Sequence, residues 1–386
     1  MRCVPRLGRY PTVVVLLAAI SGLASSGCRK YPEPELRADI ERQGRQIFRY
    51  DTFGDEQFWT DTAQLHRVVD TKIQPLEALG LGLKVDLARL NLLKFVLHNP
   101  FGTSGTRELL RENAVVGVKA TFAKDGHIAR IGITCALCHS TVDNALVPGI
   151  GYRLDGWPNR DLKVGKILAM LAAFTPQQKA VLRTWPKGTY DPRFNFDGKS
   201  TPLVLPPAYG LAAIKNETYT AEGPISYWNN YVAVTQMHGH GNFSDPRLGV
   251  NIVQTPDMVT SKLPALRAYQ HSLEPPRESM DDAARRGKVV FDANCARCHV
   301  SGNLTDNNSG VLHAPSETGM NPVYALRTTQ KQYRTTPLRG LRHHPPYFHD
   351  GSATSLRDVV DHYARVRSLQ LSENQRKDLA KYLATL

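Results

Sequence analysis

The sequence predicts a mainly α-helical protein with two similar cysteine-containing domains, loop-rich insertions, a short β-hairpin before the first cysteine motif and an N-terminal helical extension. Two observations support this fold class. The pattern Cys-x-x-Cys-His occurs twice, as "CALCH" at 135–139 and as "CARCH" at 295–299. Segments with apolar residues at every third or fourth position flank both motifs, whereas only one stretch alternates as paired strands do.

The first residues of the chain have the features of an export signal. Three arginines among the first nine residues precede an apolar run at 13–24, which is too short to cross a bilayer comfortably. The stretch "LASSGC", which ends at Cys28, is similar to a bacterial lipoprotein cleavage site, where the cysteine becomes the lipidated first residue. We expect a signal peptide at 1–27 and a periplasmic protein anchored to the membrane through Cys28. Ordinary signal cleavage near Cys28 is the alternative.

The remaining chain divides into three regions. Helical periodicity predicts an N-terminal helical region at 28–110. The alternating stretches "AVVGVKATF" and "HIARIGIT" predict a hairpin that leads to Cys135, within a first domain at 111–274 that also contains an amphipathic helix, "LKVGKILAMLAAF". Two prolines in "SLEPPRES" mark a boundary, and the second domain follows at 277–386.

The second domain begins and ends with a predicted helix. The segment "SMDDAARRGKVVF" contains Gly287 and Phe291, and "LSENQRKDLAKYLATL" begins with a capping box of Ser372 and Gln375. The Gly-x-x-x-Phe spacing also occurs earlier, without cysteines, in "RQGRQIF". That repeat is either a remnant of a lost module or a coincidence.

The chemistry of the two motifs follows from the cysteine count. Of six cysteines, Cys3 leaves with the signal, Cys28 is the predicted anchor, and the other four all lie in the motifs. A zinc ribbon would pair its Cys-x-x-Cys units across roughly 15 to 20 residues, and a redox dithiol needs one motif only. An exported chain with this pattern indicates covalent attachment of haem, so we predict two haem c groups held by Cys135, Cys138, Cys295 and Cys298. His139 and His299 are then the proximal iron ligands.

The net charge of +13 is spread over several short blocks. Such blocks could attract an acidic redox partner or bind haem propionates. We expect no nucleic-acid binding, because the basic residues form no stripe interleaved with aromatic residues.

The C-terminal stretch "YRTTPLRGLRHHPPYFHDGSATSLRDVVDHY" resembles the signature of the bacterial di-haem cytochrome c peroxidase and MauG superfamily. The resemblance covers roughly residues 281–386. Over the first domain it depends on the order and spacing of the two motifs, and the first hundred residues lie outside it. Di-haem rubber oxygenases have a similar architecture. The resemblance implies two cytochrome c-like haem domains.

Tyr363 is the predicted iron ligand opposite His299. In the peroxidases, a methionine on the helix after His-Asp-Gly completes the second haem, and in the MauG branch a tyrosine does so. In this sequence the matching position is Tyr363, and a helix capped by Ser355 would place it on an apolar stripe. A hydrogen-bonded core tyrosine is the alternative, with Met320 or His362 as other candidate ligands.

The residues on the side of the first haem opposite His139 are harder to predict from the sequence. The segment "TQMHGHGNF" offers Met237, His238 and His240, of which any could cap the iron, and we take His238 and His240 as candidate catalytic acid–base groups. Trp228, in "ISYWNN", is a candidate for the aromatic position between the haems, although the family's usual Phe-Trp-Asp-Gly-Arg stretch is missing. Arg339 is a candidate for binding a propionate. Some family members also bind calcium between the domains, so calcium is an additional candidate cofactor.

These observations predict an oxidoreductase. We expect electrons to pass from the C-terminal haem to an N-terminal haem that reduces hydrogen peroxide or activates dioxygen, with a small electron-donor protein or cytochrome as partner. The alternative is a non-catalytic periplasmic electron-transfer cytochrome in which both haems are six-coordinate.

Overall fold

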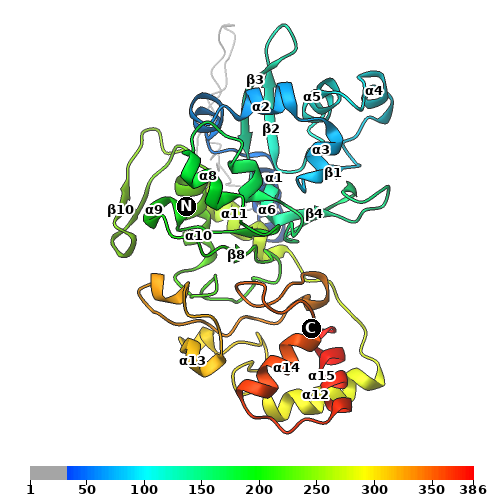
Figure 1. Cartoon of the computed structure of the whole chain (residues 1–386), viewed down its shortest axis with the longest axis vertical. Coiled ribbons are helices and arrows are strands. Elements are labelled where there is room, and N and C mark those ends of the chain that lie inside the picture. The colour runs from blue at the N-terminus through cyan, green and yellow to red at the C-terminus, as the bar shows by residue number, and fades with distance from the viewer. Residues whose placement is uncertain (1–32) are drawn as a thin grey trace, which may run out of the picture.

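The computed structural model describes residues 33–386, so the predicted signal peptide and Cys28 lie outside the described residues. The chain forms two halves, with the first motif in the upper half of Figure 1 and the second motif in the lower half. None of the described helices is both long enough and apolar enough to cross a membrane.

Helices dominate both halves, as predicted. Up to the first motif the α-helices are α1 (Glu33–Tyr50), α2 (Leu65–Lys72), α3 (Pro75–Gly80), α4 (Leu92–Leu97), α5 (Thr103–Arg111) and α6 (Ala136–His139). Between the motifs they are α7 (Val164–Leu168), α8 (Pro176–Leu182), α9 (Phe194–Asp197), α10 (Ile225–Tyr231), α11 (Leu263–Ser272) and α12 (Asp282–Asn294). After the second motif follow α13 (Pro315–Thr318), α14 (Leu356–Val366) and α15 (Glu373–Leu383).

The described strands form small two-stranded sheets, all in the upper half. The pairs are β1 (Val85–Asp86) with β5 (Ile150–Gly151), β2 (Val118–Phe122) with β3 (Ile128–Ile133), β4 (Ser140–Val142) with β6 (Arg153–Asp155), β7 (Thr189–Tyr190) with β8 (Leu203–Val204), and β9 (Phe243–Asp245) with β10 (Val250–Ile252). The β2–β3 pair is the antiparallel hairpin that the sequence predicts, and it ends just before Cys135.

Two crossing helices enclose the second motif. Helix α12 lies directly against α15, and a Cβ atom on Gly287 would come within 1.9 Å of the Asp378 carbonyl oxygen, so only glycine permits this approach. The ring of Phe291 packs edge-on against Tyr382, with ring centres 5.2 Å apart. Ser372 caps α15 with the predicted capping box, because its hydroxyl accepts a hydrogen bond from the Gln375 amide.

The upper half contains a helix pair of the same construction. Helix α1 packs on α11, and a Cβ atom on Gly44 would lie 1.9 Å from the Ala265 carbonyl oxygen. Phe48, fully buried, packs edge-on against Tyr269 with ring centres 5.6 Å apart. The Gly-x-x-x-Phe spacing of "RQGRQIF" therefore has the same structural role as that of α12. Helix α1 also contacts α6, which contains part of the first motif.

Two predicted helices are interrupted in the structure. The stretch after α1 forms a π-helical turn, η1 (Gln57–Thr62), and then α2, because Gln64 between them adopts a left-handed conformation with φ 55°. The predicted helix "LKVGKILAMLAAF" is helical only over α7. The apolar residues after α7 serve another purpose, since Ala173 and Phe174 line the large cavity described below.

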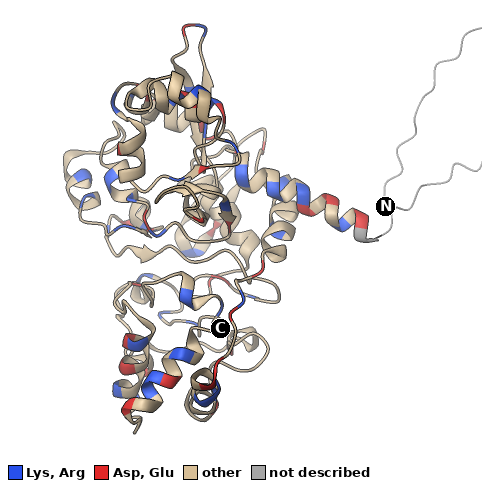
Figure 2. Ribbon diagram, turned by 90° about the vertical axis from the view of Figure 1, so that its right-hand side faces the viewer, with Lys and Arg blue, Asp and Glu red and all other residues tan. Residues whose placement is uncertain are grey.

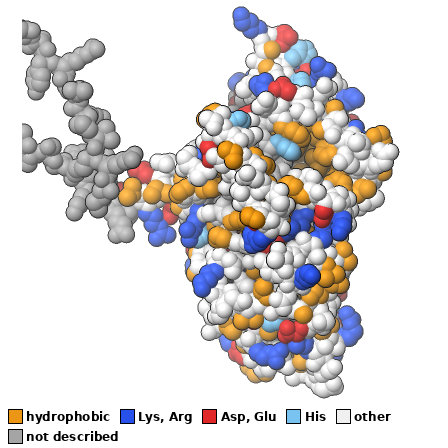
Figure 3. All heavy atoms as spheres, turned by 90° about the vertical axis from the view of Figure 1, so that its left-hand side faces the viewer, with side chains coloured by type: hydrophobic (Ala, Val, Ile, Leu, Met, Phe, Trp, Pro, Cys, Tyr) orange, Lys and Arg blue, Asp and Glu red, His pale blue; other side chains and the backbone are white. Residues whose placement is uncertain are grey.

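Charged side chains are mostly dispersed over the surface. Basic and acidic bands alternate along the projecting end of α1 (Figure 2), where Arg37 pairs with Glu41. On the face drawn in Figure 3, lysine and arginine side chains are separated by other residues and form no continuous stripe. This distribution agrees with the expectation that the excess of positive charge is scattered.

A buried ion-pair cluster joins the two halves. Arg327, in the lower half, lies 2.8 Å from a carboxylate oxygen of Asp191 and 2.8 Å from one of Asp197, both in the upper half. The side chains of Arg327 and Asp191 are 4% and 0% exposed. Because such pairs hold their partners in fixed geometry, this cluster fixes how the halves meet.

Candidate functional site

Both motifs open into one large cavity. Its volume is about 1070 Å³, and its lining includes the two cysteines and the histidine of each motif. The rest of the wall is mainly apolar and aromatic. A cavity of this size is at the upper end of those that hold small molecules and cofactors.

The first motif is held by backbone hydrogen bonds to the loop that follows it. The amide of Gly156 donates to the His139 carbonyl at 2.8 Å, and the amide of Asn159 donates to the Cys138 carbonyl at 2.9 Å. The Nδ1 atom of His139 lies 3.1 Å from the Pro206 carbonyl oxygen, which fixes Nδ1 as the protonated nitrogen. Burial lowers the pKa of His139 to about 4, so the imidazole is neutral and Nε2 carries a lone pair.

The second motif has the same arrangement. Cys295 caps the end of α12, and His299 Nδ1 lies 3.0 Å from the Leu304 carbonyl oxygen. Burial also lowers the pKa of His299. A histidine that donates through one ring nitrogen to a carbonyl and keeps the other free is oriented as a metal ligand.

The cysteines do not have the properties of a redox dithiol. Burial raises the pKa of Cys135 and of Cys138 to about 12, and that of Cys295 to about 11. A reactive dithiol needs a lowered thiol pKa. All four thiols are also free of disulfides.

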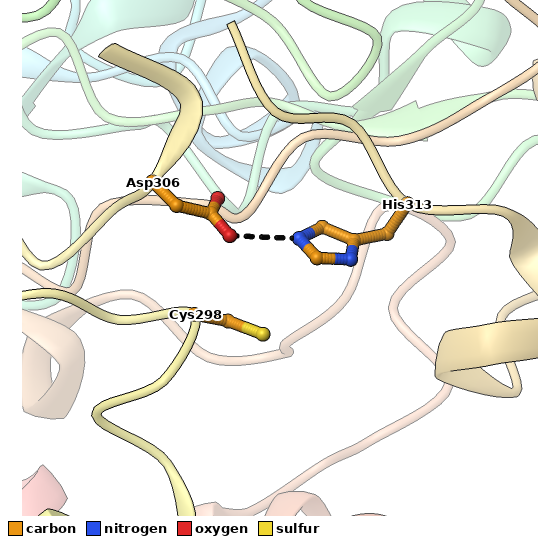
Figure 4. Close-up of side chains that lie close together, drawn as sticks. All are labelled: Cys298, Asp306 and His313. Carbon is orange, nitrogen blue, oxygen red and sulfur yellow. Dashed lines mark hydrogen bonds and ion pairs between the residues drawn. The ribbon is translucent and has the colours of Figure 1, made fainter. Parts of the chain in front are cut away.

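Nor do the cysteines assemble a zinc site. Among the described residues, one group has the spacing of metal ligands: Cys298, Asp306 and His313 (Figure 4). Both ring nitrogens of His313 are engaged there, Nε2 with Asp306 at 2.9 Å and Nδ1 with Glu317 at 3.0 Å. The imidazole therefore has no free lone pair for a metal ion.

Tyr363 lies on the cavity wall near the second motif. Ser355 caps α14 as predicted, and Val359, Val360 and Tyr363 all line the cavity. Burial and the neighbouring Cys298 raise the pKa of Tyr363 to about 12, and its hydroxyl hydrogen-bonds to no other described residue. His362, in contrast, points away and hydrogen-bonds through Nε2 to the Thr318 carbonyl at 2.9 Å.

His238 lies on the cavity wall near the first motif. It follows a π-helical turn, η2 (Val232–Gln236), and has a φ of 63°, which is uncommon for a residue other than glycine. Its ring stacks on Phe58 at 3.6 Å, and neither ring nitrogen hydrogen-bonds to another described residue. His238 is exposed at the cavity wall, and desolvation by the protein around its ring lowers its pKa to about 4. Met237 lines the cavity beside it.

The other two predicted catalytic residues have different positions. His240 is not part of the cavity lining, and its Nδ1 lies 2.7 Å from the Pro256 carbonyl oxygen. Trp228 lines the cavity within the core of the upper half, 5.1 Å from the Tyr231 ring, and its indole N–H has no partner. Aromatic residues that do reach the lower half include Trp157, whose ring lies 4.9 Å from that of His343, and Tyr209, whose hydroxyl donates to the Gly340 carbonyl.

Known proteins are similar to parts of this chain. The cytochrome c family matches residues 284–386. The methylamine utilization protein MauG of Methylophilus methylotrophus is 25% identical over 292 residues, which cover 71% of this chain and 78% of that protein. MauG of Methylorubrum extorquens (strain ATCC 14718 / DSM 1338 / JCM 2805 / NCIMB 9133 / AM1) is 33% identical over 120 residues, or 27% of this chain and 34% of that protein. These similarities agree with the resemblance to MauG and the di-haem cytochrome c peroxidases that the sequence predicts.

Among solved structures, a MauG-like protein associated with microbial copper homeostasis aligns with a TM-score of 0.36 at 17% identity, covering 49% of this chain and 74% of that one. Hydrazine synthase of Kuenenia stuttgartiensis aligns with a TM-score of 0.35 at 18% identity, covering 48% and 73%.

The match to the cytochrome c family and the similarity to MauG support covalently bound haem c and a haem-based oxidoreductase or electron-transfer function. The number of haem groups stays a prediction, as do the roles of the individual residues. Calcium, the other candidate cofactor, has no support.

The cavity offers the partners that a haem requires. Four of its lining residues carry buried N–H groups without a partner among the described residues: Arg160, Trp228, Arg334 and Arg339. Arg339 uses another nitrogen to donate to Asn303 at 3.1 Å. Haem propionates are carboxylates that accept such hydrogen bonds, and the apolar walls suit the porphyrin. The residues present therefore fit haem.

Sequence reasoning missed the polar side chains that accompany His238. The hydroxyl of Tyr190 donates to Gln236 Oε1 at 2.6 Å, and both residues line the cavity. Gln236 precedes Met237 directly, so its position was readable, but Tyr190 lies in the short strand β7 and belongs to no motif. The buried arginines Arg160 and Arg334 were missed for the same reason.

Proposed function

We propose that this chain is an exported, lipid-anchored protein with two haem c groups, one at each motif, which reduces hydrogen peroxide or activates dioxygen at the first. Electrons enter from a donor protein at the second motif and pass to the first. Haem supplies an iron that changes its oxidation state and binds small oxygen species. The difference between the two sites carries this proposal: a tyrosine faces the second, and a neutral, unbonded histidine faces the first.

At the second site, Tyr363 is the residue that would ligate the iron of a bound haem. A phenol that is buried among apolar residues and lacks a hydrogen-bond partner is destabilised unless its oxygen finds another partner. Tyr363 is oriented into the cavity, so the iron of a bound haem would be that partner. This arrangement favours electron transfer over ligand binding at the second site.

At the first site, His238 acts as the acid–base group. With a pKa of about 4 its imidazole is neutral at ordinary pH, so a ring nitrogen can accept a proton from peroxide and return it to the leaving oxygen. Stacking on Phe58 holds the ring in place. The hydrogen-bonded pair of Tyr190 and Gln236 lines the same cavity and supplies further polar atoms to it.

One observation favours a second candidate function. The unbonded imidazole of His238 could also bind the iron directly, and the protein would then be an electron-transfer cytochrome with two six-coordinate haems.

Low-temperature EPR of the purified ferric protein, with and without hydrogen peroxide, separates the two candidates. A high-spin signal that disappears on addition of peroxide supports the enzyme, and two low-spin signals that do not respond would overturn the proposal. His238→Ala should slow the reaction with peroxide about a hundredfold. His240→Ala is the matched control and should leave the rate unchanged, because His240 is turned away from the cavity.

A further inference from the structure

Arg160 is a partly buried cation that has no counter-ion among the described residues. Its guanidinium lines the cavity, and its Nε and Nη1 atoms are buried without a hydrogen-bond partner. Among the described residues no carboxylate lies within ion-pair distance of it, whereas the buried Arg334 pairs with Glu217. An unpaired buried charge costs several kcal/mol, so a native protein rarely keeps one unless a ligand neutralises it.

The backbone places Arg160 at the first motif. The preceding residue, Asn159, donates its amide to the Cys138 carbonyl and its side-chain Nδ2 to the Gly82 carbonyl at 2.9 Å. Arg160 and His139 both line the cavity. Its position is therefore fixed relative to the haem attachment site.

Neutral groups surround the guanidinium from both halves of the molecule. Tyr209 and Tyr219 belong to the upper half, and Tyr347 and His344 to the lower half, and all four line the cavity. Burial lowers the pKa of His344 to about 4 and raises that of Tyr347 to about 12, so neither residue supplies a negative charge. The missing anion must come from a group within the cavity.

We propose that Arg160 binds a propionate carboxylate of the haem attached at Cys135 and Cys138, where the two halves of the molecule meet. Guanidinium and carboxylate form strong paired hydrogen bonds, and a haem at this motif brings the carboxylates into the cavity. The inference relies on the proposed haem at the first motif but not on its reaction with peroxide. It holds equally if the protein only carries electrons.

By neutralising the propionate, Arg160 changes the reduction potential of the first haem iron. A propionate that has lost its counter-ion keeps its full negative charge near the iron and stabilises the ferric over the ferrous state. Arg160 therefore raises the reduction potential of the first haem. Electrons from the second haem then move toward the first more readily.

The test is a spectroelectrochemical titration of the purified di-haem protein and of its Arg160→Gln variant, with resonance Raman spectra of both. We expect a lower potential for the haem at the first motif and shifted propionate bending bands, with partial recovery in Arg160→Lys. Arg153→Gln is the matched control, because Arg153 is also buried in the upper half but pairs with Asp86 and does not line the cavity. It should leave both readouts unchanged.

Haem content by pyridine haemochrome confirms that each variant is loaded. A loaded Arg160→Gln protein with an unchanged first-haem potential and unchanged propionate bands would overturn the inference. So would equal shifts in Arg153→Gln, which would mean that loss of any buried arginine disturbs the haem. Neither result would bear on the peroxide reaction, which the EPR experiment tests separately.

Discussion

The substitution Gly287→Ala tests whether the contact between α12 and α15 holds the second haem domain together. The added Cβ would lie 1.9 Å from the Asp378 carbonyl oxygen, well inside the 3.0 Å that such atoms keep. Both partners are helix backbone, so the helices must separate by more than an ångström. Overpacking costs about 1–3 kcal/mol, and we expect the upper end, about 3 kcal/mol, which lowers the folding equilibrium constant more than a hundredfold.

Denaturant titration followed by the haem absorbance and by EPR measures this effect. The signal of the second haem should be lost at lower denaturant than in the parent protein. Gly44→Ala, with the same 1.9 Å approach to Ala265, should do the same to the first haem. Gly80→Ala is the control, because a Cβ there meets nothing within 4 Å. A midpoint for Gly287→Ala equal to that of Gly80→Ala would refute the reasoning.

Three further predictions concern single side chains. Tyr363→Phe should change the EPR and visible spectrum of the second haem while the first keeps its own, and identical spectra would exclude Tyr363 as a ligand. The peroxide reaction should keep its rate at neutral pH and fall as the pH approaches about 4, because only the neutral imidazole of His238 accepts a proton; stopped-flow rates across this range check the sign. Arg327→Gln leaves the buried Asp191 carboxylate without its ion-pair partner and should cost about 3–5 kcal/mol in urea unfolding, whereas Arg37→Gln, an exposed pair, should cost less than about 1 kcal/mol.

Local features of the sequence predicted the second half of the molecule well. The N-cap at Ser355, the capping box at Ser372 and the helix stripe of Tyr363 depend on neighbours within a few residues, and all three occur as expected. The β2–β3 hairpin was equally readable, because its strands are separated by a short turn.

Features that depend on distant contacts were not readable. The spacing of Gly44 and Phe48 was visible, but its meaning depends on α11, more than two hundred residues away. Periodicity predicted a longer helix around α7 than the structure has, and it did not reveal that apolar residues inside and beyond α7 line a cavity. Arg160 belongs to no motif, and its lack of a counter-ion becomes evident only when the tertiary neighbours are known.

The two matching helix pairs imply that the two halves of the molecule close at different rates during folding. The pair α12–α15 joins Gly287 to Asp378, whereas α1–α11 joins Gly44 to Ala265, across more than twice as many residues. Closing the longer loop costs about 0.8 kcal/mol more in chain entropy. Non-local contacts also form more slowly. Once the whole chain is available, the upper half therefore forms its helix pair more slowly than the lower half, and "CALCH" stays accessible for longer than "CARCH".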